Sequence, residues 1–212
     1  MTRRTALTST TRLEAFSDGV FAIAITLLVL EIRVPPIQAT ANGRELVTAL
    51  RELWPSYLGY LISFVTLGIM WANHHSMFRY VHRSNFHFLL INVLFLMFIS
   101  FLPFPTALLA TYLPVPDGRQ AATAFYSAVL FVIALGFNAV WRYAVHGDRL
   151  LDPAADREAV KTISRRYLIG PTAYGVAFGL AFVNVWASLA VHGILTGLFL
   201  VPEHRGWLSS GA

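Results

Sequence analysis

The sequence contains no cysteine and few charged residues. With no cysteine among its 212 residues, the chain has no disulfide, thiolate metal site or cysteine nucleophile. Charged residues make up 13% of the chain, whereas they make up about a quarter of a typical soluble domain. Neither a Ser-His-Asp set nor a glycine-rich phosphate loop nor a dinucleotide-binding glycine pattern is found. The sequence therefore does not indicate an enzyme.

What the sequence has in excess is apolar surface. Hydrophobic residues make up 56% of the chain, and its mean hydropathy is +0.59. Lipid is the simplest partner for this surplus, so we predict an all-α polytopic membrane protein that forms one domain over residues 1–212. The net charge is +5. Because the basic residues lie between the apolar runs, they indicate orientation in a membrane rather than nucleic-acid binding.

The apolar runs predict six transmembrane helices. The first, Leu13–Arg33, is long enough for a hydrocarbon core of about 30 Å and ends at Pro35-Pro36. The last run, Tyr167–Val201, is too long for one crossing, so we expect two helices with a turn near Asn184. The other expected elements are Leu46–His75, with Pro55 as a kink or as its true first turn, Phe86–Leu113 with a break near Phe101–Pro105, Ala121–Tyr143, and a short surface helix from Asp152-Pro153.

The basic residues also predict sidedness. With six crossings, 12 of the 16 Lys and Arg residues fall on the side of the two termini and 4 on the other. This positive-inside bias predicts that both termini are cytoplasmic. We expect the protein to lie in the plasma membrane. Residues 1–11 are expected to be a flexible tail. The first run ends without a small-x-small cleavage site, so we expect a retained helix rather than a signal peptide.

The first helix carries an acid, Asp18, that points away from an apolar stripe. A carboxylate at this depth costs a few kcal/mol unless it is paired, and Arg12 lies about 240° away around the same helix. Its partner should therefore come from another helix, unless Asp18 reaches interfacial water. Candidates at the end of the second helix are Trp71, His74 and His75. The stripe, within about 60° on a helical wheel, consists of Arg12, Phe16, Ile23, Leu27 and Leu30.

Other motifs give weaker signals. His82 and His87 have the spacing of a membrane histidine box, but the chain offers too few further ligands, so we expect hydrogen-bonding histidines and no metal site. Thr172–Val176 resembles a potassium-channel filter poorly and is expected to be helix. One functional alternative stays open. A secondary transporter or proton-coupled cation exchanger could use Asp18 with His74 or His75 as a titrating relay.

The start of the first helix resembles a known family. Arg12, Phe16, Ser17 and Asp18 match the R-x-x-x-F-S-D signature of the endosomal–lysosomal potassium channel family and its bacterial relatives, and the match continues through Gly19–Leu30. The resemblance implies a homotetramer of six-helix subunits in lipid, with the first helices around a central pore. It implies no cofactor, only permeant potassium and other monovalent cations.

The resemblance also implies roles for individual residues. Bulky aliphatic rings would form the constriction, and such a ring gates by excluding water, with modest selectivity. A threonine layer would contribute to potassium preference, while an acid at the outer end could concentrate cations. The corresponding residues are Ile23, Leu27 and Leu30 for the constriction, Thr26 for selectivity, Glu31 for the pore mouth, and Arg12, Phe16, Ser17, Asp18, Trp71, His74 and His75 for a structural network.

Overall fold

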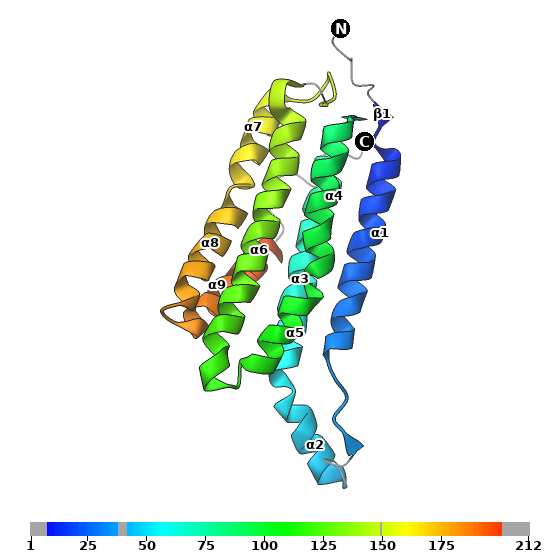
Figure 1. Cartoon of the computed structure of the whole chain (residues 1–212). Coiled ribbons are helices and arrows are strands. Elements are labelled where there is room, and N and C mark those ends of the chain that lie inside the picture. Colours follow the sequence, from blue (N-terminus) through cyan, green and yellow to red (C-terminus); the bar gives the residue numbers. More distant parts are fainter. Residues whose placement is uncertain (1–7, 38–41, 149, 201–212) are drawn as a thin grey trace.

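The chain folds into a bundle of long helices (Figure 1). The structure, a computed structural model, describes residues 8–37, 42–148 and 150–200. The helices in chain order are α1 Thr11–Leu27 with its 3-10 continuation η1 Leu28–Glu31, α2 Gly43–Glu52, α3 Trp54–Met77, α4 Phe86–Phe101, α5 Pro103–Tyr112, α6 Pro116–Val145 with η3 His146–Asp148, α7 Arg157–Arg166, α8 Ile169–Ala181 and α9 Val185–Leu200.

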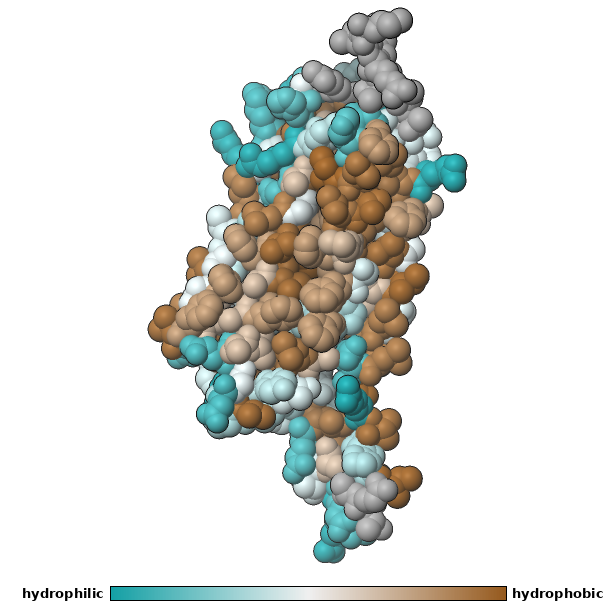
Figure 2. Space-filling view, in the orientation of Figure 1, coloured by the Kyte–Doolittle hydropathy of each residue, from teal (hydrophilic) through white to brown (hydrophobic). Residues whose placement is uncertain are grey.

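Four stretches of the described chain are long and apolar enough to cross a membrane. They are Thr11–Glu31, Trp54–Met77, Phe86–Tyr112 and Pro116–Asp148. The two C-terminal helices are shorter, with 13 residues in α8 and 16 in α9. Figure 2 shows the matching surface, in which a broad hydrophobic band lies between two hydrophilic ends. A membrane protein built from apolar helices is thus confirmed.

Prolines set several helix boundaries. The expectation of one helix over Leu46–His75 is wrong, since α2 ends at Glu52. The alternative that Pro55 marks the true first turn is confirmed, because α3 begins at Trp54 with Pro55 in its first turn. There the missing N–H of proline costs no helical hydrogen bond. The expected break near Phe101–Pro105 is confirmed at Leu102, between α4 and α5. For the same reason α6 starts at Pro116, earlier than the predicted Ala121.

Capping side chains set other boundaries. The predicted turn near Asn184 is confirmed, and the Asn184 side chain accepts a hydrogen bond of 3.1 Å from the Ala187 N–H at the start of α9. The surface helix α7 begins at Arg157 instead of Asp152, because Asp156 is its N-cap and accepts from the Glu158 N–H. The first helix ends in η1 at Glu31, two residues before the predicted Arg33.

Two short strand contacts join the loops at the end of the bundle that carries α7. Strand β1, Thr8–Ser9, pairs antiparallel with β2, Arg83–Ser84, and Val81 forms a bridge with Leu151. The expectation of a flexible tail over residues 1–11 is therefore wrong for Thr8–Ser9, and residues 1–7 lie outside the described part. These contacts fix the start of α1 beside the α3–α4 loop.

The helices differ in how much of their surface the subunit covers. Of the most apolar stretch of α6, 61% is buried, against 28% for α1. In Figure 1, α6 runs through the middle of the bundle and α1 stands at its edge. α1 thus has one face packed on the bundle, and much of the rest of its surface is exposed.

Gly59 provides a test of the packing between α3 and α5. A Cβ added at Gly59 would lie 3.4 Å from Thr106 Cγ2 and 3.6 Å from the Thr106 carbonyl oxygen. We expect Gly59→Leu to destabilise the protein by about 1–3 kcal/mol through overpacking, measured as a lower thermal unfolding midpoint in detergent. Gly68→Leu, on the same helix with open space at its Cβ, is the control. Equal midpoints for the two variants would contradict this packing.

Candidate functional site

One face of α1 is packed into the bundle. Its buried residues repeat every three or four positions, which places them on one side of the helix. Phe21, Ala24 and Leu28 are fully buried against the subunit's own core. The buried face comprises Leu13, Ser17, Phe21, Ala24 and Leu28.

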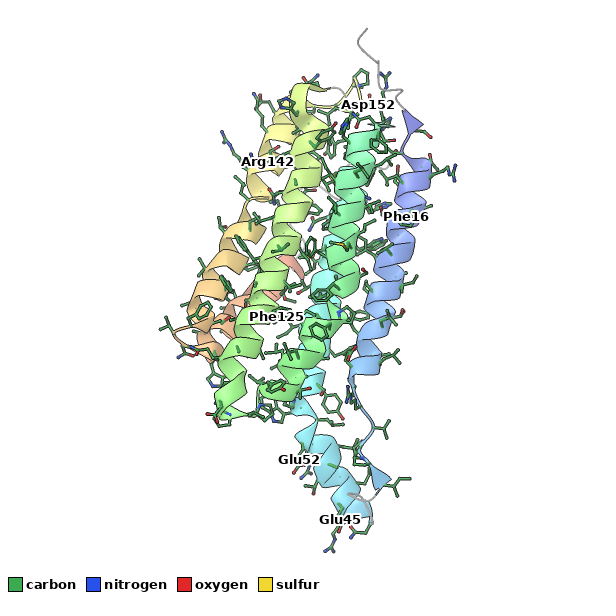
Figure 3. All side chains as sticks on the ribbon, viewed as in Figure 1. Phe16, Glu45, Glu52, Phe125, Arg142 and Asp152 are labelled. Carbon is green, nitrogen blue, oxygen red and sulfur yellow. The ribbon has the colours of Figure 1, made fainter. Side chains whose placement is uncertain are left out.

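A second face of α1, about 115° around the helix from the buried face, is exposed. Ile23 is 61% exposed, Leu27 40% and Leu30 69%, and Thr26 is exposed beside them. The apolar stripe predicted from the sequence is therefore 40 to 69% exposed in the subunit, and only its outer end approaches α4 and α5. Figure 3 shows side chains projecting outward from this edge helix. Such a face must meet lipid, another subunit or a pore.

A chain of three hydrogen bonds fixes α1 against α3 and α4. His74 Nε2 lies 2.9 Å from Asn92 Oδ1, Asn92 Nδ2 lies 3.0 Å from Ser17 Oγ, and Ser17 Oγ lies 2.8 Å from the Leu13 carbonyl oxygen. A carbonyl oxygen can only accept, so Ser17 donates to Leu13, Asn92 donates to Ser17, and His74 donates to Asn92. We call these residues the His74–Asn92–Ser17 chain. All three side chains are buried, with 1% or less of their surface exposed.

Aromatic rings surround His74. Its ring stacks on Phe95 at a centroid distance of 5.7 Å and an interplanar angle of 17°, and it contacts Phe21 at 5.5 Å and Phe78 at 5.0 Å. These contacts orient the imidazole towards Asn92. The surroundings favour a fixed hydrogen-bond donor rather than a group that exchanges protons with water.

Asp18 has an inter-helix partner. Trp71 Nε1 on α3 donates to Asp18 Oδ1 at 2.9 Å, so the partner comes from another helix, as the sequence analysis expects. Exposed His75 contacts the Trp71 ring at 5.9 Å. Within the described residues, no hydrogen bond or ion pair joins Asp18 to His74 or His75. The geometry therefore offers no direct relay between the acid and the histidines.

The predicted residues divide into two groups, and one residue that bonds to two of them was missed. Ser17, Asp18, Trp71 and His74 come together around α1 and α3, whereas Arg12 and Phe16 are exposed within the subunit. Asn92 links them but was not predicted. A lone amide in the strongly apolar run Phe86–Phe101 is the signal that could have identified it, because a buried amide in such a helix needs a partner.

The outer end of α1 lies beside a groove. Leu27, Leu30 and Glu31 line it together with residues of α4 and α5, including Ser100 and Thr111. The Thr26 hydroxyl donates to carbonyls of its own helix, 2.9 Å to Ile23 and 3.0 Å to Ala22. Its oxygen can still accept or coordinate on the open face. Within the described chain, no cluster of three or more His, Asp or Glu side chains is arranged to hold a metal.

Comparison with known proteins now identifies the family. The family model of the endosomal/lysosomal potassium channel TMEM175 matches residues 12–103. A potassium channel of Chamaesiphon minutus is 49% identical over 195 residues, which cover 92% of this chain and 95% of that protein. The chain belongs to the TMEM175 family. This family is one of ion channels and not of enzymes.

Two further comparisons agree with this placement in the TMEM175 family. A potassium channel of Streptomyces collinus is 44% identical over 184 residues, covering 87% of this chain and 88% of that one. The crystal structure of a lysosomal potassium-selective channel TMEM175 homolog from Chamaesiphon minutus has a TM-score of 0.81 at 46% identity, covering 90% of this chain and 96% of that chain. The resemblance drawn from the start of the first helix is confirmed at the level of the family. The matched residues 12–103 include the whole His74–Asn92–Ser17 chain.

Removal of Asn92 tests the hydrogen-bond chain. We expect Asn92→Leu to lower the stability of the protein by about 1–3 kcal/mol, because the buried donor of His74 is left without an acceptor and Ser17 loses a donor. The measurement is the thermal unfolding midpoint in detergent. Ser100→Leu is the control, since exposed Ser100 on the same helix bonds only the Met97 carbonyl. A midpoint for Asn92→Leu no lower than that of the control would contradict the assignment.

Proposed function

We propose that this chain forms a moderately selective potassium channel, as a tetramer of single six-helix units in the plasma membrane, with both termini in the cytoplasm. Two close relatives are named potassium channels, and the similar crystal structure is titled a potassium-selective channel. In this arrangement α8 and α9 complete the six crossings. The described basic residues of α7 and of the α3–α4 loop gather at one end of the bundle, which supports the cytoplasmic assignment of that end.

The observation that carries the proposal is the open face of α1. Ile23, Leu27 and Leu30 form an aliphatic stripe that is 40 to 69% exposed in the subunit, while the buried face of the same helix is held by hydrogen bonds. A rigid helix with such a stripe suits a symmetric pore, because four copies would bring equal side chains to one axis. The stripe would then form stacked rings.

A narrow ring of aliphatic side chains blocks ions because it excludes water. Where the ring is narrow, water leaves it, and an ion cannot cross because nothing there replaces its hydration shell. Selectivity then depends on oxygens close to the constriction, and Thr26 is the hydroxyl that lies between Ile23 and Leu30 on the exposed side. Glu31 at the outer end would raise the local cation concentration.

The structural network has a supporting role in this proposal. Ser17, Asp18, Trp71 and His74 hold α1, and Arg12 and Phe16, exposed in one subunit, would contact a neighbouring subunit. His75 supports the Trp71 ring. A proton-coupled exchanger is less well supported, because Asp18 is bonded to Trp71 and His74 is enclosed by phenylalanines.

Potassium flux in liposomes tests the function. Purified protein in potassium-loaded vesicles should release potassium well above empty vesicles, at rates that stay proportional to the gradient. Flux equal to that of empty vesicles would end the proposal, and strictly coupled, saturating exchange would favour the transporter.

Polar substitutions test the constriction. We expect Ile23→Asn and Leu27→Asn each to raise potassium leak several-fold, because an amide keeps the ring hydrated. Val29→Asn is the matched control, since Val29 is 50% exposed but lies about 120° around the helix from Ile23. If both stripe variants leak no more than the control, the constriction is elsewhere.

A further inference from the structure

The groove at the outer end of α1 is large enough for a ligand. Its walls come from α1, η1, α4 and α5, and Figure 1 shows the end of α1 beside α5. Pro103, at the break between α4 and α5, is one of its lining residues. We call it the outer groove. Its volume is about 470 Å³, within the range of roughly 300–1,000 Å³ that is usual for ligand sites.

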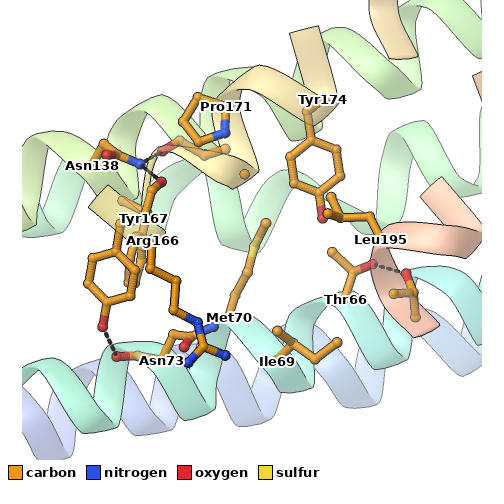
Figure 4. Close-up of a pocket in the computed structure, with 14 residues that line it drawn as sticks. Thr66, Ile69, Met70, Asn73, Asn138, Arg166, Tyr167, Pro171, Tyr174 and Leu195 are labelled. Atoms are coloured by element: carbon orange, nitrogen blue, oxygen red, sulfur yellow. Dashed lines mark hydrogen bonds between the residues drawn. The ribbon is translucent and has the colours of Figure 1, made fainter. Parts of the chain in front are cut away.

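A second hollow, between α3, α6 and α8, is much smaller (Figure 4). Its volume is about 60 Å³, which is room for only a few water molecules at about 10–15 Å³ each. At one end of it, Thr66 and Thr196 already bond each other at 3.3 Å. A ligand with an acyl chain therefore fits the outer groove and not this pocket.

The inner part of the outer groove is apolar. Leu27, Phe101 and Phe104 line it, and 40 to 53% of their surface is exposed. The hydroxyls of Ser100 and Thr111 donate to carbonyl oxygens of their own helices at 2.9 Å, so they need no further acceptor. From Ser100 to Thr111 the helical wall is about 16 Å long. This is about half of the hydrocarbon core of roughly 30 Å, the depth of one leaflet.

The mouth of the outer groove carries one carboxylate and one guanidinium, those of Glu31 and Arg33. Ile32 between them has an extended backbone, with φ −85° and ψ 92°, so the two side chains start from the same side of the chain. Within the described residues, neither side chain forms a hydrogen bond or an ion pair. Both charges are therefore available to a ligand.

These features match a phospholipid whose headgroup carries both signs. Arginine binds a phosphodiester, and a carboxylate accepts hydrogen bonds from a primary ammonium group. Glu31 ends the membrane-crossing stretch Thr11–Glu31, so both charges lie at the edge of the apolar region. We infer that the outer groove binds a phospholipid of the phosphatidylethanolamine class. Its ammonium group lies at Glu31, its phosphodiester at Arg33, and one acyl chain along Phe101 and Phe104.

The bound lipid lies against the constriction of the proposed channel. Leu27 and Leu30 belong to the exposed stripe of α1 and also line the outer groove. The lipid thus supports these two residues from the side, a consequence that rests on the proposed function. Lipid binding itself is measured without ion flux. A failure of this inference and a failure of the channel proposal are therefore distinguishable.

Native mass spectrometry of the delipidated protein tests the ammonium contact. Phosphatidylethanolamine and phosphatidylcholine of equal acyl chains both have no net charge, so general attraction to charged surface is the same for both. The trimethylammonium group of phosphatidylcholine donates no hydrogen bond, so we expect the wild type to retain phosphatidylethanolamine about fivefold better. Glu31→Gln should reduce this preference to below about twofold, because a neutral amide is a weaker acceptor than a carboxylate.

A matched variant controls for the loss of charge. Glu45→Gln removes the same charge from α2, outside the lining of the outer groove, and should keep the preference. Equal losses in Glu31→Gln and Glu45→Gln, or no preference in the wild type, would overturn the site. Retention of neither lipid by the wild type would mean that a neighbouring subunit covers the groove, and would also overturn the inference.

The same experiment tests the phosphodiester contact. Arg33→Gln should lower the retention of both lipids several-fold, because both carry the same phosphodiester. Arg44→Gln, which removes an arginine from α2 outside the groove lining, should leave retention as in the wild type. Equal retention by the two variants would contradict the placement of the phosphodiester at Arg33.

A filling variant tests the acyl chain. Ala107 lines the outer groove, so Ala107→Trp should reduce the retention of both lipids several-fold with Glu31 and Arg33 still present. Ala121→Trp, at an exposed position of α6 outside the groove lining, should have no effect. Undiminished retention in a folded Ala107→Trp variant would show headgroup contact alone and contradict the inference. If that variant does not fold, the glutamate and arginine pairs decide the matter.

Discussion

The position of α1 depends on the His74–Asn92–Ser17 chain. In an apolar bundle the van der Waals contacts between helices are weakly directional, so they leave rotation and sliding only loosely fixed. Three buried side chains from three helices remove that freedom, because each donor has one acceptor within reach. Leaving any of them unpaired in such surroundings is unfavourable. The His74–Asn92–Ser17 chain therefore sets both the depth of α1 in the bundle and its rotation about its own axis.

Because one face of α1 is fixed in the bundle, the residues on its exposed face are determined as well. With Ser17, Phe21 and Leu28 buried, Ile23, Leu27 and Leu30 are left on the open side. A gate made of side-chain rings needs every copy of the helix to present the same residues at the same height. The Trp71–Asp18 bond adds a second contact to α3 close to the start of the helix. In the proposed channel, the polar residues of the signature would therefore position the apolar ones.

Much of this arrangement could be predicted from the sequence. Hydrophobic runs indicate the membrane helices, and proline and asparagine end or begin helices through their effect on neighbouring residues. Pro103 and Asn184 predicted their breaks because a missing N–H and a capping side chain act within one turn. The Thr8–Ser9 pairing was missed, because it depends on tertiary contacts. Asn92 was missed for the same reason. Its hydrogen-bond partners, His74 and Ser17, lie 18 and 75 residues away in the sequence. One polar side chain in an apolar run does not identify partners at such distances.

The most direct test of the central claim uses the cysteine-free chain. Single cysteines are introduced at Leu27, Leu30 and Val29, and potassium flux is followed before and after a charged, water-soluble thiol reagent. If the open stripe of α1 lines the ion path, the reagent reduces flux through Leu27→Cys and Leu30→Cys and leaves Val29→Cys unchanged, since Val29 lies about 100° from Leu30 on the helix. Block at Val29→Cys with no effect at Leu27→Cys or Leu30→Cys would contradict the account.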